Sequence, residues 1–447
     1  MAIFRFMHAA DLHLDSPFRG LSDVPKPIRD RIRSSTFMAL ERLVELAISE
    51  QVRFVVIAGD VYDLEDRSVR AQLRFQRAME QLASEGIEVY IAHGNHDPLS
   101  GKHMQWQPPR GIHVFPGDGV SAHAVHDRSG RLLAHVQGIS FATPAVTDNL
   151  AGKFRPVDRS VFQIGVLHTN VDGAAEHGNY APSSRAELVA SGIDYWALGH
   201  IHARGILHEA PHIVYPGNTQ GRSIRETGAK GCYIVDVEED KAVRMRFHST
   251  DAVRWLQVEV SVEAARSEQE VQERIARELE AIRESADLAG RPAVVRLVLG
   301  GRTSLNRLLR SSSWLDEAAG EWNREEGRRV ESDPDYPFVW VESIRAQTSG
   351  LIDRERLLGQ DSFVGDLLRL ADELRTDEAQ LEQFAEQMTE ELLRSRAGKY
   401  IREGQAVYAG AAGDAVHGAV GREELREWLD RAEEWLLDRL LEGGDQR

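Results

Sequence analysis

Five short motifs of this chain carry residues that could do chemistry, and each follows a run of β-forming residues. Together the motifs supply carboxylates, one amide and several imidazoles, a mixture of oxygen and nitrogen donors that suits divalent Mn, Fe or Zn. Two such ions a few ångströms apart can activate a water molecule that hydrolyses a phosphate ester. The candidate ligands are Asp11, His13, Asp60, Asn95, His168, His200 and His202.

The position of these motifs explains how residues so far apart in the sequence could meet. In an open α/β sheet the carboxyl ends of the strands face one crevice, and the motifs begin within three residues of the ends of predicted strands. Asp60 is the natural bridge between two ions, and His200 and His202 can each reach a different ion. Ordinary turns are the alternative explanation, but turns alone do not account for all five motifs together.

His96 lies beside Asn95 and is not needed as a ligand, so we predict that it is a general acid or positions the scissile phosphate. Asp63 would hydrogen-bond His96 and favour its protonated form. A purely structural role for His96 is the alternative. We also predict substrate contacts for four residues, although solvated arginines without a ligand are equally common: Arg19, His177, Arg222 and Arg225.

Composition and charge narrow the class of protein. The chain has 447 residues, of which 42% are hydrophobic, so two or three globular domains are expected. It has no run of 18 apolar residues, its N-terminus does not resemble a signal peptide, and Cys232 is its single cysteine. These features predict a cytoplasmic protein without a membrane span or a disulfide. The net charge of −17 argues against a broad basic surface but leaves room for a local DNA channel.

The pattern of apolar residues predicts three regions. Residues 1–248 alternate strands with helices, and residues 249–348 form a smaller α+β unit. Residues 349–447 are acidic and helical, and their last helix carries an apolar stripe from Leu425 to Leu440 that includes Trp428 and Trp435. This stripe either packs on the rest of the chain or docks onto a partner protein. Predicted strands cover 3–8, 54–58, 87–92, 112–115, 132–139, 162–167, 195–198, 213–215 and 232–237, and predicted helices cover 35–51 and 69–84.

The motif set resembles the calcineurin-like metallophosphoesterase superfamily. Three longer stretches, at residues 11–18, 168–173 and 215–222, are similar to the SbcD-like branch of DNA repair nucleases and to its YhaO-type bacterial members. The resemblance covers residues 1–245 well, fades over 250–345 and is slight beyond. It implies an α/β fold: a two-sheet α/β/β/α sandwich, followed by a small α+β capping domain and a helical C-terminal region.

The resemblance also implies how the ligands divide between the ions. Asp11, His13, Asp60 and His202 would hold one metal. The other would be held by Asp60, Asn95, His168 and His200. The metal would be Mn²⁺, with Fe²⁺, Zn²⁺ and Mg²⁺ as alternatives. Asp63 departs from the relatives that carry His at its position.

The function implied is a metal-dependent phosphodiesterase of DNA repair, a DNA exonuclease with endonuclease activity as a further possibility. Its implied partners are DNA, an SbcC-like or YhaN-like coiled-coil ATPase of the SMC type, and a second copy of the chain. One alternative is a phosphatase or a phosphodiesterase of small molecules or cyclic nucleotides, which would not need residues 250–447 as a DNA clamp. Another is a non-catalytic scaffold, which the intact ligand set disfavours.

Overall fold

The computed structural model describes residues 3–18, 20–21, 24–63, 68–101, 104, 106–173, 178–377, 379–385, 387 and 422–442. The chain divides into two compact units. The first comprises residues 1–261, 269–299 and 309–346, and the second comprises residues 262–268, 300–308 and 347–447. The predicted α+β region therefore lies largely in the same unit as the predicted sandwich, while the boundaries at 248/249 and 348/349 stay predictions.

Two mixed sheets of six strands each form the centre of the first unit. One sheet has the order β12 (Val243–Ser249), β11 (Gly231–Val237), β1 (Phe4–Ala9), β2 (Phe54–Ala58), β3 (Glu88–Ala92) and β4 (Ile112–Val114). The other has the order β5 (Ser121–His126), β6 (Leu132–Gly138), β7 (Phe162–His168), β8 (Tyr195–Gly199), β10 (His212–Tyr215) and β9 (Gly205–Glu209). Strands β1 to β4 run parallel, as do β6, β7, β8 and β10. Their carboxyl ends therefore point the same way within each sheet.

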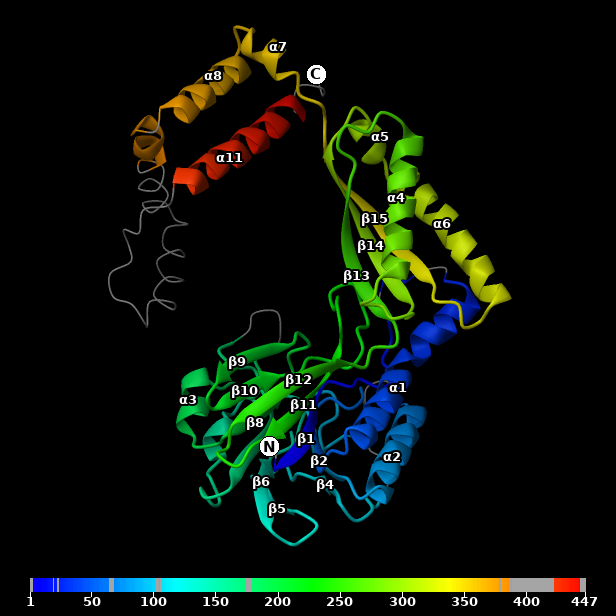
Figure 1. Ribbon diagram of the computed structural model, residues 1–447, viewed down its shortest axis with the longest axis vertical. Helices are drawn as coiled ribbons and strands as arrows, with labels where there is room; N and C mark the ends of the chain where they lie inside the picture. The colour runs from blue at the N-terminus through cyan, green and yellow to red at the C-terminus, as the bar shows by residue number, and fades with distance from the viewer. Residues whose placement is uncertain are drawn as a thin grey trace. The chain divides into compact units, whose positions relative to one another are not determined.

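Alternation along the strands separates the hydrophobic core into layers. On β2, Phe54 and Val56 face the second sheet, whereas Val55 and Ile57 face α1 (Lys26–Ser49) and α2 (Val69–Ser84). The outer face of the second sheet is covered by η2 (Ala151–Lys153) and α3 (Arg185–Ala190), which pack on Trp196. Figure 1 shows α1 and α2 on one side of the strands and α3 on the other. The predicted α/β/β/α sandwich is confirmed.

Some element boundaries differ from the prediction. The prediction lacked three strands at the edges of the sheets, β5, β9 and β12. Their residues are largely exposed or half-buried, so these strands have no apolar run of the kind that identified the others. Helix α1 begins at Lys26, well before the predicted Ser35. It begins there because Pro27 suits a first helical turn and because Ile28 and Ile32 are buried.

The α+β region contributes a sheet of β13 (Arg254–Ser261), β14 (Ala293–Arg302) and β15 (Val339–Ser349) with α4 (Glu268–Glu284), α5 (Asn306–Leu309) and α6 (Ser312–Ser332). Its Trp255 and Phe338 pack in one hydrophobic cluster with Ile28 and Ile32 of α1. Arg31 of α1 donates hydrogen bonds to the carbonyls of Pro334 and Tyr336. Apolar and polar contacts therefore join α1 to this region.

The second unit contains α7 (Arg354–Leu358), α8 (Phe363–Thr376) and α11 (Arg422–Glu442), and Leu368 and Leu374 of α8 pack on α11. The apolar spacing of Leu370, Leu374, Leu381, Phe384, Met388 and Leu392 predicts one helix. Instead, α8 ends at Thr376, because the Asp377 side chain accepts the backbone N–H groups of Ala379 and Gln380 and starts a new turn. Met388 and Leu392 of that prediction lie outside the described residues. No helix among the described residues is long and apolar enough to cross a membrane.

Candidate metal centre

The candidate ligands stand directly after strands of both sheets. Asp11 and His13 follow β1, Asp60 follows β2, and Asn95, His168, His200 and His202 follow or end β3, β7 and β8. Three of the loops have unusual backbone: φ is +52° at Asp11, +50° at Asp60 and +103° at His200. Such conformations cost free energy and concentrate at functional sites, where the surrounding fold enforces them.

The first ligand group consists of Asp11, His13 and His202, whose donor atoms lie within 4.8 Å of one another. The Nδ1 of His13 donates to Asp63 Oδ1 at 2.7 Å, and the Nδ1 of His202 donates to Glu226 Oε1 at 2.7 Å. In neutral rings this leaves both Nε2 atoms unprotonated, yet they face each other at 3.1 Å. A cation bound by both lone pairs removes their repulsion, so these residues fit a metal.

The second group consists of Asp11, Asp60 and His168. His168 Nδ1 donates to the Ala58 carbonyl at 3.1 Å, so the lone pair of Nε2 faces Asn95 Oδ1 at 3.0 Å and Asp60 Oδ2 at 3.4 Å. Three acceptors that face one another also call for a cation. Asp11 belongs to both groups, and the predicted bridge Asp60 also lies 3.7 Å from His13 Nε2.

His200 lies beside these groups and is not a member of either. Its backbone N–H donates to both carboxylate oxygens of Asp11, at 3.0 and 3.2 Å, and its ring centroid is 5.1 Å from that of His168. Its Nε2 donates to the Gly178 carbonyl at 2.8 Å, which leaves Nδ1 as the unprotonated nitrogen of the neutral ring. The structure thus brings all seven predicted ligands into one region.

Burial shapes the charges of these residues. Burial raises the pKa of Asp11 to about 7, and the Asp60 carboxylate acts in the same direction while His202 opposes it. Burial also lowers the pKa of His13 and of His168 to about 4. The imidazoles of His13 and His168 are therefore neutral at pH 7, the form in which imidazoles bind metals. A divalent cation would stabilise the ionised form of Asp11.

His96 is the accessible member of the site, because 45% of its side chain is exposed while the imidazoles of His13 and His168 are buried. Its Nδ1 lies 3.1 Å from Asp63 Oδ1. Burial by itself would lower the pKa of His96, but the hydrogen bond to Asp63 and the charges of Asp60 and Asp63 raise it to about 9. Asp63 and His96 therefore form the pair that the sequence predicted, with a protonated imidazole.

Of the predicted substrate contacts, two are described. Arg222 lies 3.6 Å from Asp63 Oδ2 and 3.5 Å from Glu226 Oε1, so its guanidinium bridges the carboxylates that orient His13 and His202. Arg225 is exposed on the same loop. Arg19 and His177 lie outside the described residues.

Two supporting residues complete the centre. Asp97 accepts hydrogen bonds from the backbone of Gly94 and Val61 and from His93 Nδ1, so it holds the turn that carries Asn95 and His96. The place of Asp97 directly after Asn95 and His96 predicts such a supporting role, whereas nothing in the sequence points to Glu226. Glu226 follows no strand and matches no metal motif, so only the folded loop shows that it contacts His202.

Comparison with known proteins agrees with this geometry. The sequence profile of the calcineurin-like phosphoesterases matches residues 4–204, and that of the middle domain of metallophosphoesterase YhaO matches residues 255–349. The chain is 37% identical to the uncharacterized metallophosphoesterase YhaO of Bacillus subtilis over 81% of this chain and 85% of that one. The match to the YhaO middle domain extends the similarity to the α+β region.

Two more distant relatives each match about half of the chain. The DNA double-strand break repair protein Mre11 of Aeropyrum pernix is 28% identical over 54% of this chain and 59% of its own length. A subunit of the nuclease SbcCD of Bacillus subtilis is 26% identical over 52% of this chain and 66% of its own length. On the YhaO match and the metal-binding geometry, the chain belongs to the calcineurin-like metallophosphoesterases, a family of metal-dependent hydrolases.

Proposed function

We propose that this protein is a two-metal phosphodiesterase that hydrolyses DNA, acting as an exonuclease in DNA repair. The observation that carries the proposal is the pair of buried ligand groups that share Asp11, in which unprotonated imidazole nitrogens face each other and carboxylates. The names of two relatives, a DNA double-strand break repair protein and a nuclease subunit, support DNA as the substrate.

In this proposal Asp11, His13, Asp60 and His202 hold one ion, and Asp60, Asn95, His168 and His200 hold the other. When bound, two divalent ions lower the pKa of water and neutralise charge on the phosphate. Mn²⁺ is the metal we propose, and Fe²⁺, Zn²⁺ and Mg²⁺ are alternative outcomes of a metal titration. Oxygen and imidazole donors suit Mn²⁺ and Fe²⁺, but they do not by themselves select one metal.

His96 supplies the proton for the leaving ribose oxygen. With a pKa raised to about 9, its imidazole is protonated at neutral pH and is open to a substrate on its exposed side. Asp63 holds the ring through Nδ1, so Nε2 carries the proton that is donated. Arg225, exposed beside the centre, is proposed to contact a neighbouring phosphate.

The partner we propose is an SMC-type coiled-coil ATPase, with the chain itself forming a homodimer. Support comes from the relative that is named as one subunit of a nuclease. Trp428 and Trp435 of α11 have 46% and 60% of their surface exposed, so the predicted apolar stripe is only partly covered by α8. A partner that covers these two indoles would remove apolar surface from water.

The test is Mn²⁺-dependent degradation of end-labelled linear duplex DNA by the wild type, by His96→Ala and by Asp60→Ala. His126→Ala, which removes an exposed imidazole from β5, is the matched control. We expect the wild type and His126→Ala to degrade DNA alike. His96→Ala should lose about 10²- to 10⁴-fold in rate, the range for a general acid, and should retain its bound metal as measured by mass spectrometry. Asp60→Ala should lose both activity and metal.

A second substrate separates the alternatives. If wild-type enzyme loaded with metal leaves DNA intact but hydrolyses bis(p-nitrophenyl) phosphate rapidly, the test is repeated with the ATPase partner present. Failure on DNA in that assay as well would replace the nuclease by a phosphodiesterase of small molecules. Equal DNA degradation by His96→Ala and wild type would overturn the assignment of the general acid.

A further inference from the structure

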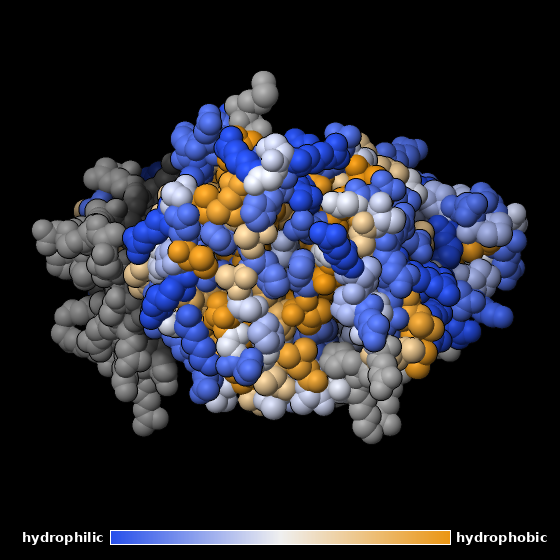
Figure 2. All heavy atoms as spheres, turned by 90° about the horizontal axis from the view of Figure 1, so that it is seen from below, coloured by the Kyte–Doolittle hydropathy of each residue, from blue (hydrophilic) through white to orange (hydrophobic). Residues whose placement is uncertain are grey.

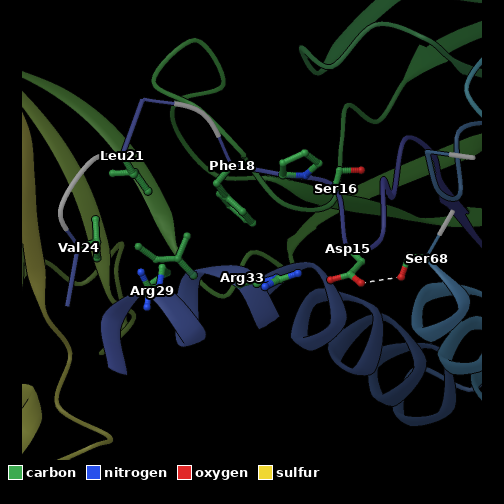
Figure 3. A pocket seen from close by; sticks show the side chains of 10 residues that line it. Asp15, Ser16, Phe18, Leu21, Val24, Arg29, Arg33 and Ser68 are labelled. Carbon is green, nitrogen blue, oxygen red and sulfur yellow. Dashed lines mark hydrogen bonds between the residues drawn. The ribbon is translucent and has the colours of Figure 1, made fainter. Parts of the chain in front are cut away.

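A pocket of about 430 Å³ opens beside the metal centre. Its lining comes from the loop after His13, from the first turns of α1 and from the start of α2. Figure 3 shows Phe18 extending from this loop toward α1, with Arg29 and Arg33 on the helix and with Asp15 and Ser68 at the other end. The lining residues are Asp15, Ser16, Pro17, Phe18, Leu21, Val24, Arg29, Ile32, Arg33 and Ser68.

The walls of the pocket combine a flat aromatic ring with apolar side chains. Phe18 and Leu21 are half-buried against a cluster that includes Val24 and Ile32. A half-buried phenyl ring keeps one part packed and another part available to a ligand. Rings in this setting stack on nucleic-acid bases, because every base has an apolar π-face.

Two arginines without partners line the same pocket. Arg29 and Arg33 are four residues apart on α1 and so lie on one face of the helix. Within the described part of the chain, neither guanidinium makes an ion pair or a hydrogen bond, whereas Arg31 between them bonds to Pro334 and Tyr336. In a chain with a net charge of −17, two adjacent unpaired arginines indicate an anionic ligand such as a phosphate.

The opposite end of the pocket is acidic. Asp15 Oδ2 accepts a hydrogen bond from Ser68 Oγ at 2.6 Å, and Asp15 Oδ1 lies 3.5 Å from Arg70. A simple anion would be repelled at this end. A ligand with a phosphate at one end and hydrogen-bond donors at the other, such as a nucleotide, fits both ends.

The pocket is connected to the proposed general acid by short contacts. Ser16 in its wall donates to Asp63 Oδ2 at 2.6 Å, and Asp63 Oδ1 is 3.1 Å from His96 Nδ1. We propose that the pocket holds one nucleotide of the DNA next to the cleaved bond, with its base on Phe18 and its phosphate between Arg29 and Arg33. This inference rests on the proposed phosphodiesterase function and names the part of the substrate that this pocket recognises.

The test compares two chromogenic phosphodiesters, thymidine 5′-(p-nitrophenyl phosphate), which carries a nucleoside, and bis(p-nitrophenyl) phosphate, which does not. The variants are Phe18→Ala and the double variant Arg29→Gln with Arg33→Gln, and the matched control is Arg77→Gln, an exposed arginine of α2. We expect Phe18→Ala to lower kcat/KM for the nucleoside ester about tenfold relative to kcat/KM for bis(p-nitrophenyl) phosphate, the size of one lost stacking contact. The double variant should keep the wild-type ratio, because neither ester has a second phosphate for Arg29 and Arg33, and its effect is expected on oligonucleotide binding. Arg77→Gln should keep the wild-type ratio.

A second readout does not depend on the metals. Binding of a short fluorescent oligothymidylate to metal-free protein in chelator is measured by anisotropy, and both pocket variants should weaken it about tenfold. Phe18→Leu, which preserves the packing but not the aromatic face, should behave like Phe18→Ala if stacking matters. Wild-type behaviour of Phe18→Leu in both readouts would assign Phe18 a packing role and overturn base stacking.

The outcomes separate the two proposals. Wild-type protein that hydrolyses neither ester with any of the four metals would sink the proposed function. Wild-type protein that hydrolyses both esters, while the variants change neither the ratio nor the anisotropy, would sink the nucleotide pocket and leave the function standing. Loss of both activities in equal proportion by the double variant, with unchanged oligonucleotide binding, would show that the arginines act on the metal centre instead.

Discussion

At the scale of single residues, the centre depends on three side chains that are not ligands. Asp63 and Glu226 accept the Nδ1 protons of His13 and His202, and Arg222 contacts both carboxylates. The hydrogen bond from His202 and the charge of Arg222 hold the pKa of Glu226 well below its usual range, although burial alone would raise it. Glu226 is therefore ionised at neutral pH and fixes the tautomer in which His202 Nε2 can bind a metal.

Removing Glu226 should consequently weaken metal binding. We expect Glu226→Ala to reduce Mn²⁺ affinity about 10- to 100-fold, the usual effect of losing the carboxylate behind a metal-binding histidine. Glu226→Gln should recover part of the loss, because an amide oxygen can still accept the Nδ1 proton. Calorimetric titration with Mn²⁺ measures this, and Glu209→Gln, at an exposed acid of β9, is the control. An unchanged affinity in Glu226→Ala would mean that His202 is oriented by other contacts.

At the scale of elements, the two sheets lie in close contact where the ligands emerge. A Cβ atom at Gly199, the last residue of β8, would lie 1.7 Å from the Ala58 carbonyl oxygen of β2 and 3.0 Å from His168 Nδ1. That same carbonyl accepts the Nδ1 proton of His168. The absence of a side chain at Gly199 thus lets one sheet orient a ligand that belongs to the other.

Gly199→Ala should disturb both folding and the metal centre. We expect it to lower the free energy of unfolding by about 1–3 kcal/mol, the usual cost of overpacking, and to weaken Mn²⁺ binding because His168 must move. Urea unfolding and calorimetric titration measure the two effects. Gly205→Ala in β9 is the control, since a Cβ atom there meets no atom within 4 Å. Wild-type stability in Gly199→Ala would show that the sheets can separate without cost.

Some of these elements have a local sequence pattern that predicts them, and others do not. Strands such as β2 and β3 are buried on both faces, so their apolar runs and the polar residues after them could be identified from the sequence. Edge strands such as β12 and the start of α1 are defined by contacts with distant residues, and no local pattern marks them. For the same reason the gathering of the candidate ligands could be predicted, whereas the contact of Glu226 with His202 could not, because only tertiary structure brings these two residues together.

At the scale of the whole molecule, the proposed DNA substrate is a polyanion, whereas the chain has a net charge of −17. On the face shown in Figure 2, hydrophobic residues occur in groups between hydrophilic ones. Residues 351–447 hold 23 acidic and 13 basic residues, so much of the negative charge belongs to the C-terminal region. The metal centre, with two divalent ions, and the neighbouring Arg29 and Arg33 would then form a local positive site in an acidic protein.

Folding of the whole sandwich should depend on pH through His8, which is fully buried between the sheets and contacts Tyr195 Oη at 3.1 Å and the Leu198 carbonyl at 3.2 Å. Burial lowers its pKa to about 3, whereas in the unfolded chain a histidine has a pKa of about 6.5. Below pH 6.5, His8 therefore binds a proton in the unfolded state but stays neutral in the native state. The stability contributed by neutral His8 is complete above pH 6.5 and falls by about 1.4 kcal/mol per pH unit below it.

Comparison with His8→Gln isolates this contribution, because the buried imidazoles of His13 and His168 titrate in the same direction in both proteins. Both proteins are unfolded with urea at pH 7.5 and at pH 5.5. A chelator is present in each experiment, so that bound metal does not contribute to stability. We expect the variant to have a lower free energy of unfolding than the wild type at pH 7.5. This difference should shrink by about 1.4 kcal/mol at pH 5.5, because only the wild type is destabilised when unfolded His8 binds a proton. A gap that is the same at both pH values would mean that His8 accepts a proton within the fold, and that the space between the sheets admits a charge.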